Sequence, residues 1–151
     1  MITYVIKHFP AFVQASIRFN DPSGKLPRMA KLIFGCGYLG KQVARRWLAG
    51  GQDVYALTRS SVRAAEFQSW GLRPVVGDLT RPLRLPQLPP LDTVLFSVGF
   101  DHSAGQSVRD VYVDGLSHAL DALSGPITRF IYISSTWVYG QKDGQWIDEH
   151  S

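Results

Sequence analysis

The stretch Lys31-Leu32-Ile33-Phe34-Gly35-Cys36-Gly37-Tyr38-Leu39-Gly40-Lys41-Gln42-Val43-Ala44-Arg45-Arg46-Trp47-Leu48 decides the fold of this chain. Its first four residues have the character of a buried strand, and they lead directly into the pattern Gly-x-Gly-x-x-Gly. A helical pattern follows at once, with apolar residues on one face and Lys41, Arg45 and Arg46 on the other. A strand, a glycine turn and a helix in this order form the fingerprint of a dinucleotide-binding fold.

The three glycines have different tasks in that fingerprint. Gly35 permits the tight turn, Gly37 lets the backbone approach a pyrophosphate, and Gly40 lets the helix pack against the strand. The first turn of the helix, with Tyr38 and Leu39, directs its N–H groups and the positive end of its dipole at the anion. An ordinary glycine-rich turn is the alternative when the pattern stands alone, and the flanking strand and helix favour the fingerprint.

Length and composition describe one ordinary globular domain. The chain has 151 residues, of which 45% are hydrophobic and 19% charged. No apolar run approaches the roughly 20 residues that span a bilayer, so no membrane partner is expected. The net charge is +4 and the pI about 9.4, but the basic residues are scattered, and nucleic acid is therefore not an expected partner.

Cysteine and histidine usage bears on metals and on the compartment. The single Cys36 excludes an internal disulfide and a Cys-based zinc site, and it fits a reducing cytoplasm. Because Cys36 lies inside the glycine turn, where a small residue is required, a spacer role is favoured over a reactive thiol. The four histidines show no metal-ligand spacing, so no metal is expected, and a surface role is the default for His118 on its helix.

Residues 1–28 stand outside the pattern that follows them. A domain of this kind normally begins a residue or two before its first strand, where Met29 lies. We therefore favour Met29 as the natural start and residues 1–28 as an upstream extension of unclear role. An ordered additional helix and a targeting segment are the alternatives.

The rest of the chain alternates between strands and helices. Such alternation predicts an α/β fold, a Rossmann-type doubly wound parallel sheet of about five strands. A proline-rich connection over 82–90 fits neither a helix interior nor a central strand. After the first strand, further strands are predicted over 53–57, 73–76, 91–99 and 129–135, and further helices over 61–70 and 111–123.

The end of the second predicted strand bears on the choice of cofactor. In NAD-selective folds, an acidic residue about 20 positions beyond the glycines holds the ribose 2′-hydroxyl. Thr58 occupies that position here and Arg59 follows it. With no carboxylate to repel a 2′-phosphate and a guanidinium to bind it, NADP(H) is favoured over NAD(H). The alternative is that Arg59 is a solvent-exposed loop residue.

Four stretches in the right order carry a resemblance to a known superfamily. They are Gly35–Gly40, Gly77-Asp78-Leu79-Thr80, Val113-Asp114-Gly115 and Ser134-Ser135-Thr136-Trp137-Val138-Tyr139-Gly140. Over residues 29–151 the chain resembles the extended short-chain dehydrogenases/reductases, the NAD(P)-dependent sugar-nucleotide epimerases and dehydratases. The resemblance implies an incomplete NAD(P)-binding Rossmann domain over 29–151, truncated at its C-terminus, because members of the superfamily continue well beyond this point.

The resemblance also implies roles for individual residues. Asp78 and Leu79 would lie at the adenine, and Ser97, Val98 and Gly99 at the adenine ribose and the middle of the dinucleotide. Ser135 matches the catalytic Ser/Thr that hydrogen-bonds the reacting oxygen of the substrate. The alternatives are a turn-forming role for Asp78 and an ordinary strand-end hydroxyl for Ser135.

The chain departs from the superfamily in three respects. The glycine spacing is Gly-x-Gly-x-x-Gly, whereas most extended members have Gly-x-x-Gly-x-x-Gly. The run Gly144-Gln145-Trp146-Ile147-Asp148-Glu149 resembles an atypical bacterial branch. The catalytic Tyr-x-x-x-Lys is absent, because Tyr139 is followed by Lys142 after three positions and not four.

The expected function follows from the resemblance. It implies an NAD(P)-dependent oxidoreductase or epimerase acting on a hydroxyl/ketone pair of a nucleotide-linked sugar. Hydride would pass to or from the nicotinamide, with Ser135 polarising the oxygen and a tyrosine outside this chain moving the proton. Two alternatives remain open, a non-catalytic dinucleotide-binding or redox-sensing module and an inactive truncated fragment.

Overall fold

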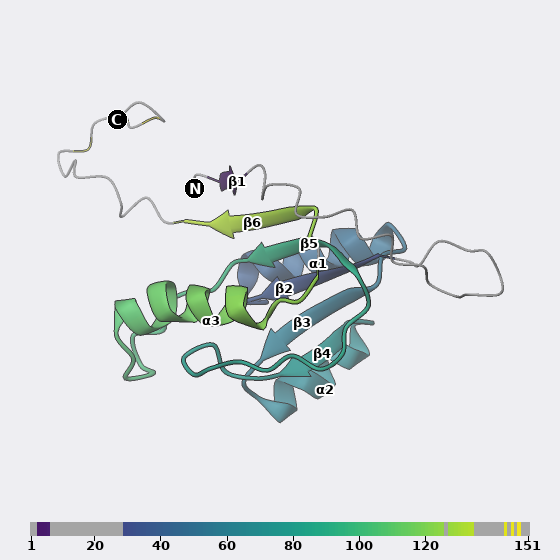
Figure 1. The fold of residues 1–151 in the computed structure, drawn as a ribbon, viewed down its shortest axis with the longest axis horizontal. Helices are drawn as coiled ribbons and strands as arrows, with labels where there is room; N and C mark the ends of the chain where they lie inside the picture. Colours follow the sequence, from purple (N-terminus) through teal and green to yellow (C-terminus); the bar gives the residue numbers. More distant parts are fainter. Residues whose placement is uncertain are drawn as a thin grey trace.

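The computed structural model describes residues 3–6, 29–125 and 127–134, together with Gly144, Trp146 and Asp148. Within these residues the chain forms one six-stranded sheet with helices on both faces (Figure 1). Five of the strands run parallel to their neighbours, as the alternating pattern predicts. The strands are β1 (Thr3–Ile6), β2 (Ala30–Phe34), β3 (Val54–Thr58), β4 (Arg73–Val76), β5 (Leu91–Phe96) and β6 (Arg129–Ile133).

The order in which the chain adds strands reverses at the centre of the sheet. In the spatial order β1-β6-β5-β2-β3-β4, β2 pairs with β3 on one side and with β5 on the other. The chain therefore builds outward through β3 and β4, returns to the middle, and builds outward again through β5 and β6. In sheets of this type, ligands bind beyond the carboxyl ends of the strands at the point of reversal. That point lies between β2 and β5.

One strand of the sheet was not predicted from the sequence. Thr3–Ile6 forms β1, which runs antiparallel to β6 and pairs Tyr4 with Tyr132 and Val5 with Ile131. The expected extension over residues 1–28 thus contributes an edge strand, where the alternative weighed was an added helix. A four-residue strand is too short to show an alternating pattern, and its partner lies near the other end of the described chain.

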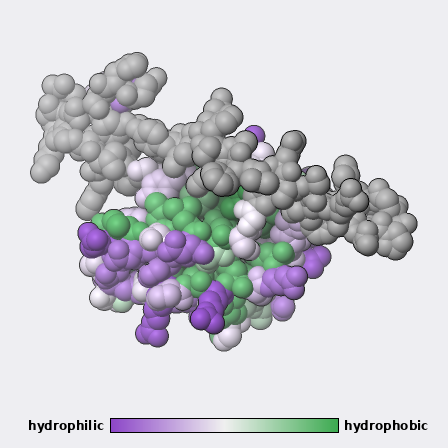
Figure 2. All heavy atoms as spheres, in the orientation of Figure 1, coloured by the Kyte–Doolittle hydropathy of each residue, from purple (hydrophilic) through white to green (hydrophobic). Residues whose placement is uncertain are grey.

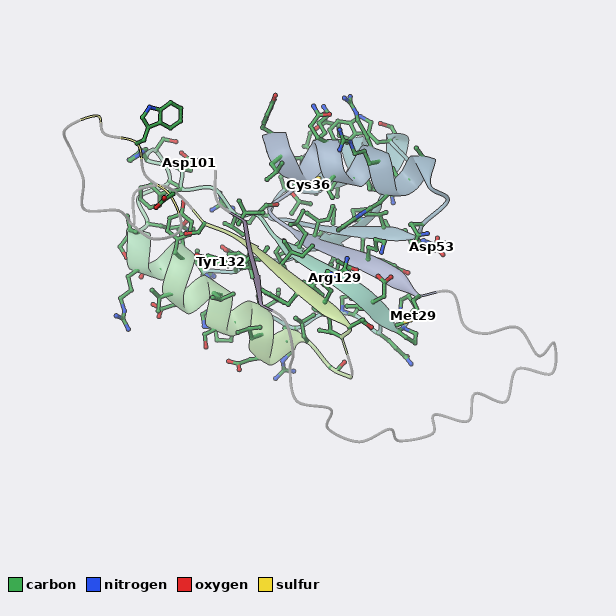
Figure 3. All side chains as sticks on the ribbon, turned by 90° about the horizontal axis from the view of Figure 1, so that it is seen from above. Met29, Cys36, Asp53, Asp101, Arg129 and Tyr132 are labelled. Carbon is green, nitrogen blue, oxygen red and sulfur yellow. The ribbon has the colours of Figure 1, made fainter. Side chains whose placement is uncertain are left out.

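Helices cover the two faces of the sheet unequally. In the view of Figure 3, α1 and α3 lie on opposite sides of the strands. Buried residues of α1 (Tyr38–Ala49) and α2 (Ser61–Ser69) pack with Ile33, Val54 and Leu95 on one face. On the other face, α3 (Gly115–Ala122) packs through Ala119 on a cluster that includes Phe34 and Phe96.

A proline-rich connection replaces a helix between β4 and β5. The residues between these strands form no helix, and Leu83, Leu85 and Leu88 pack against the same cluster as α3. Figure 2 shows hydrophobic side chains gathered in the middle of this face and hydrophilic ones around its lower margin. The prolines prevent this connection from forming a helix or a central strand. Its leucines nevertheless cover this face of the sheet.

Several element ends differ from the sequence prediction in ways that matter for the site. Ser60 caps α2, because its Oγ accepts a hydrogen bond from Arg63 N. The predicted strand over 91–99 ends at Phe96, so the three residues after it form a loop. The predicted helix over 111–123 is interrupted, because a π-helical turn, η1 (Asp110–Asp114), precedes α3.

Candidate functional site

A cleft of about 360 Å³ lies at the carboxyl ends of the central strands. Asp101 in its wall lies at the end of the sheet opposite Met29 and Asp53, where strands β2 and β3 begin (Figure 3). The walls come from the segments that follow β2, β3, β4 and β5, and from η1. Of the residues predicted to bind a cofactor, the cleft brings together Gly35, Gly37, Thr58, Arg59, Asp78, Leu79, Val98 and Gly99.

Two glycines of the turn are required by the protein itself. Gly35 has φ +86°, and a Cβ there would lie 2.6 Å from backbone atoms of Ser97 and Val98. A Cβ on Gly40 would lie 2.5 Å from the carbonyl oxygen of Gly35. Gly35 thus allows the turn, and Gly40 allows close packing of α1 on that turn, as the fingerprint predicts.

Gly37 is different, and it supplies the test of whether a dinucleotide fits. It lines the cleft, yet a Cβ added there would meet no atom within 4 Å. No steric contact inside the described protein therefore demands a glycine at this position. A small residue at the mouth of a helix N-terminus is what close approach of a pyrophosphate requires.

The first turn of α1 is equipped for an anion. Gly37 provides no side-chain cap, and the first turn contains no acidic residue. Tyr38 is 85% exposed, and neither Tyr38 nor Leu39 lines the cleft. Their predicted contribution is through backbone N–H groups, which side-chain exposure does not test.

Ser97 is also outside the cleft lining, in spite of its predicted place at the ribose. Its Oγ donates a hydrogen bond of 2.9 Å to the carbonyl oxygen of Gly35. In this structure Ser97 therefore ties the end of β5 to the glycine turn across the point of reversal. Val98 and Gly99, which follow it, do line the cleft.

Two arginines lie in the wall beyond β3. Arg59 is exposed and donates to Oε1 of Gln106 at 3.4 Å, and Arg63 donates to the carbonyl oxygen of Cys36 at 3.4 Å. Both acceptors are neutral, and within the described part of the chain neither guanidinium forms an ion pair. Two guanidiniums outside any ion pair therefore lie in one cleft, which Asp78 and Asp101 also line, and Arg59 is near enough to both carboxylates to lower their pKa.

Arg63 was missed by the sequence analysis, although a signal was available. Arg59 and Arg63 are separated by four positions, and Arg63 lies in the first turn of the helix that follows β3. The Ser60 cap fixes the start of this helix and so places Arg63 near the glycine turn.

Thr58 is buried and accepts a hydrogen bond from Ser60 N through its hydroxyl at 3.2 Å.

Asp78 holds the wall that follows β4. Its Oδ1 accepts hydrogen bonds from Thr80 N at 3.0 Å and from Thr80 Oγ1 at 2.9 Å. Partial burial acts to raise the pKa of Asp78, but these hydrogen bonds, with Arg59 and Arg81 nearby, outweigh it and lower the pKa. Asp78 thus forms the turn, which is the alternative role considered for it, and it also lines the cleft. Gln106 also donates to Thr80 Oγ1 at 3.3 Å.

Cys36 is a spacer in this structure. The residue is 4% exposed, and burial raises the pKa of its thiol against the opposing effect of Arg63 and Lys41. A thiol with a raised pKa is a poor nucleophile at neutral pH. Its carbonyl oxygen, and not its sulfur, serves the cleft by accepting the hydrogen bond from Arg63.

Some predicted residues lie outside the described part of the chain. Ser135, the predicted catalytic residue, is among them, and so are Tyr139 and Lys142. Among the described residues, no group of three or more His, Cys, Asp or Glu is placed to hold a metal ion. The helices described here are all too short or too polar to cross a membrane.

The strand order, the cleft at the reversal point and the glycine turn define a Rossmann-type domain of the dinucleotide-binding class. The chain belongs to the NAD dependent epimerase/dehydratase family, whose model matches residues 32–151. This membership confirms the predicted resemblance and makes a nicotinamide dinucleotide the cofactor class.

Similar proteins place this family membership in context. Photosystem II assembly factor Ycf39 of Synechocystis sp. is 29% identical over 105 residues, 68% of this chain and 32% of that protein. Ycf39 of Cyanophora paradoxa is 32% identical over 111 residues, with 70% and 34% covered. A solved structure of a functionally unknown conserved protein from Silicibacter pomeroyi has 25% identity and a TM-score of 0.54, covering 82% of this chain and 41% of that one. The chain thus spans about a third of the curated relatives' length.

Proposed function

We propose that this chain binds NADP(H) in preference to NAD(H), as the dinucleotide-binding part of an oxidoreductase or epimerase. The observation that carries the proposal is the pair Arg59 and Arg63, two guanidiniums in one cleft whose hydrogen-bond acceptors are neutral. A 2′-phosphate adds a dianion to the adenine ribose, and arginine recognises phosphate through paired N–H donors. No acidic residue occupies the position of Thr58 to compete for the 2′-hydroxyl.

The other lining residues have compatible roles. The turn at Gly35 and Gly37 and the first N–H groups of α1 would hold the pyrophosphate. Asp78 and Leu79 would contact the adenine, and the segment from Ser97 to Gly99 the ribose and the middle of the dinucleotide. Bound there, the cofactor supplies hydride transfer to or from a substrate carbon.

The proposal also includes a class of substrate. We assign a hydroxyl/ketone pair of a nucleotide-linked sugar, with Ser135 donating a hydrogen bond to the reacting oxygen. This assignment rests on the family and on the position of Ser135 after the last parallel strand. A cytoplasmic location is proposed on the single buried cysteine, which fits a reducing compartment.

The test is a titration of the full chain with NADPH and with NADH. We expect tighter binding of NADPH, and Arg59→Ala should weaken NADPH binding by about tenfold or more, the effect of one charged hydrogen bond. NADH binding should change little. Arg45→Ala, an exposed arginine of α1 outside the cleft, is the matched control. Equal losses for the two nucleotides would remove the 2′-phosphate role of Arg59.

A non-catalytic dinucleotide-binding module is the second candidate function. It is favoured by relatives whose name is that of assembly factors. The two candidates differ in turnover, because only an enzyme would oxidise NADPH when a keto-sugar nucleotide is added. Tight NADPH binding without turnover over a panel of such substrates would favour the module.

A further inference from the structure

The helical segment after the Asp101 loop begins at Val108 and contains one irregular turn. The N–H of Gly115 bonds to the carbonyl oxygen of Asp110, five positions earlier, which makes η1 a π-helical turn. A π-helical turn is uncommon, and it is found often at functional sites. The regular helix predicted over 111–123 gives no reason for it. The contacts of this segment supply one.

The first contact reaches the cleft wall that follows β5. The N–H of Phe100 donates a hydrogen bond of 3.1 Å to the hydroxyl oxygen of Tyr112 in η1. The two rings also pack, with centroids 6.4 Å apart. Phe100 lines the cleft, and so does Val111, the residue before Tyr112. The π-helical turn thus presents Tyr112 to the loop and Val111 to the cleft.

The second contact reaches the wall that follows β4. Nδ1 of His118 lies 2.7 Å from the carbonyl oxygen of Leu79 and must donate, because that oxygen can only accept. Gly115 lies beside the same residue, and a Cβ there would be in ordinary contact with the Cβ of Leu79 at 3.6 Å. Leu79 is buried and lines the cleft. The default surface role expected of His118 is therefore wrong.

We propose that Tyr112 and His118 are positioning residues for the dinucleotide. Together they make η1 and α3 a brace that holds the Phe100 wall and the Leu79 wall at a fixed separation. Both walls belong to loops that leave the sheet, so the strands alone do not fix them. A cleft held in its binding shape spares the ordering cost that a mobile loop pays on binding. The inference rests on the proposed function for the identity of the ligand.

The first experiment removes one oxygen atom. Tyr112→Phe keeps the ring packing on Phe100 and deletes the acceptor of its N–H. We expect about three- to tenfold weaker binding of NADPH, and an equal loss for NADH, because the brace does not contact a 2′-phosphate. Backbone amide exchange at Phe100 should accelerate while the thermal midpoint changes little. Tyr55→Phe, in β3 and outside the cleft lining, is the matched control.

The second experiment uses the other contact. His118→Leu deletes the donor to Leu79, whereas His118→Asn places an amide N–H near the position of Nδ1 and should restore binding. Unchanged nucleotide affinity in both Tyr112→Phe and His118→Leu, with faster exchange at Phe100, would overturn the positioning role. If the wild-type chain binds neither nucleotide, the proposed function fails. Slow exchange at Phe100 in the wild type, lost in Tyr112→Phe, would then still establish the brace.

Discussion

At the scale of single residues, the three glycines of one turn serve three distinct physical needs. Gly35 and Gly40 are demanded by backbone atoms of the protein, which an added Cβ would approach to 2.6 and 2.5 Å. Gly37 has open space before it. A substitution at Gly37 should therefore separate ligand binding from folding, and a substitution at Gly40 should not.

Gly37→Val is expected to abolish binding of NADPH and NADH while the thermal midpoint stays near that of the wild type. The branched side chain enters the cleft and not the protein interior. Gly40→Ala, the comparison variant, should lose stability by about 1–3 kcal/mol because its methyl group is forced against Gly35. Calorimetric titration and thermal unfolding measure the two effects. Wild-type affinity in Gly37→Val would contradict the assignment of the pyrophosphate to this turn.

Asp78 makes stability depend on pH in a definite direction. Its pKa in the folded protein is lowered from the ordinary 3.8, so the folded state favours the carboxylate. The resulting stabilisation is complete above 3.8 and is lost as the pH falls through the lower folded-state value. Asp78→Asn should therefore be less stable than the wild type at neutral pH, and the two should converge in acid. Denaturant unfolding over a pH series measures this, and a constant difference would exclude Asp78 as the cause.

The sequence predicted those cleft residues whose position follows from a strand end. Thr58 is the last residue of β3, and Gly35, Asp78 and Val98 come directly, or within two residues, after a strand. Other lining residues, among them Arg63, Phe100, Asp101 and Gln106, lie on a helix or on a loop, where the sequence pattern assigns no direction to the side chain. Ser135 stays a prediction.

At the scale of elements, an irregular connection covers part of the sheet, as a helix does elsewhere in this fold. The segment between β4 and β5 covers the sheet with leucines spaced among prolines, without a backbone hydrogen-bond ladder of its own. Leu88 is partly buried against the cluster, whereas Gln87 beside it is exposed.

Leu88→Ala should lower the free energy of unfolding by about 1–2 kcal/mol, less than the 2–5 kcal/mol typical of fully buried leucines. The reason is that only part of the side chain leaves water on folding. Gln87→Ala, next to it in the chain, should stay within about 0.5 kcal/mol. Denaturant unfolding provides both values. Equal effects for the two variants would mean that the connection does not cover the core.

The element boundaries show what periodicity cannot predict. Apolar runs located the parallel strands, since strands buried on both faces are almost continuously hydrophobic. Periodicity did not predict the π-helical turn, because the contacts that Tyr112 and His118 make reach Phe100 and Leu79, which lie outside the helical segment. Strand β1 was not predicted for the same reason, because its partner β6 lies more than a hundred residues along the chain.

At the scale of the whole molecule, the two edges of the sheet are protected differently. β4 is short, carries an exposed Arg73 and contains Pro74, all features that discourage pairing with another chain. β6 contains no proline, although its first residue Arg129 is also exposed, and β1 pairs with it over four residues. The N-terminal strand thus covers β6, so that the outermost strand on this side of the sheet is the four-residue β1.

Replacing Tyr4 and Val5 together by proline should uncover this edge. Neighbouring residues of an antiparallel pair alternate in hydrogen bonding, so the double substitution removes at least one bond to β6. We expect self-association that grows with concentration, measured by light scattering after size exclusion. Nucleotide affinity of the monomer should be unchanged, because β1 and β6 do not line the cleft. Tyr4→Phe with Val5→Ile is the control, and a monomeric proline variant would contradict the sealing role.

The reversal of the sheet at its centre has a consequence during synthesis. The turn at Gly35 receives its hydrogen bond from Ser97, which is made 62 positions later. At about 5–20 residues per second, the ribosome needs several seconds to deliver it. Through that interval β2, buried on both faces in the finished protein, has β3 on one side and an unpaired edge on the other. A chaperone at the tunnel exit would therefore have to shield the unpaired edge of the central strand until β5 has been made.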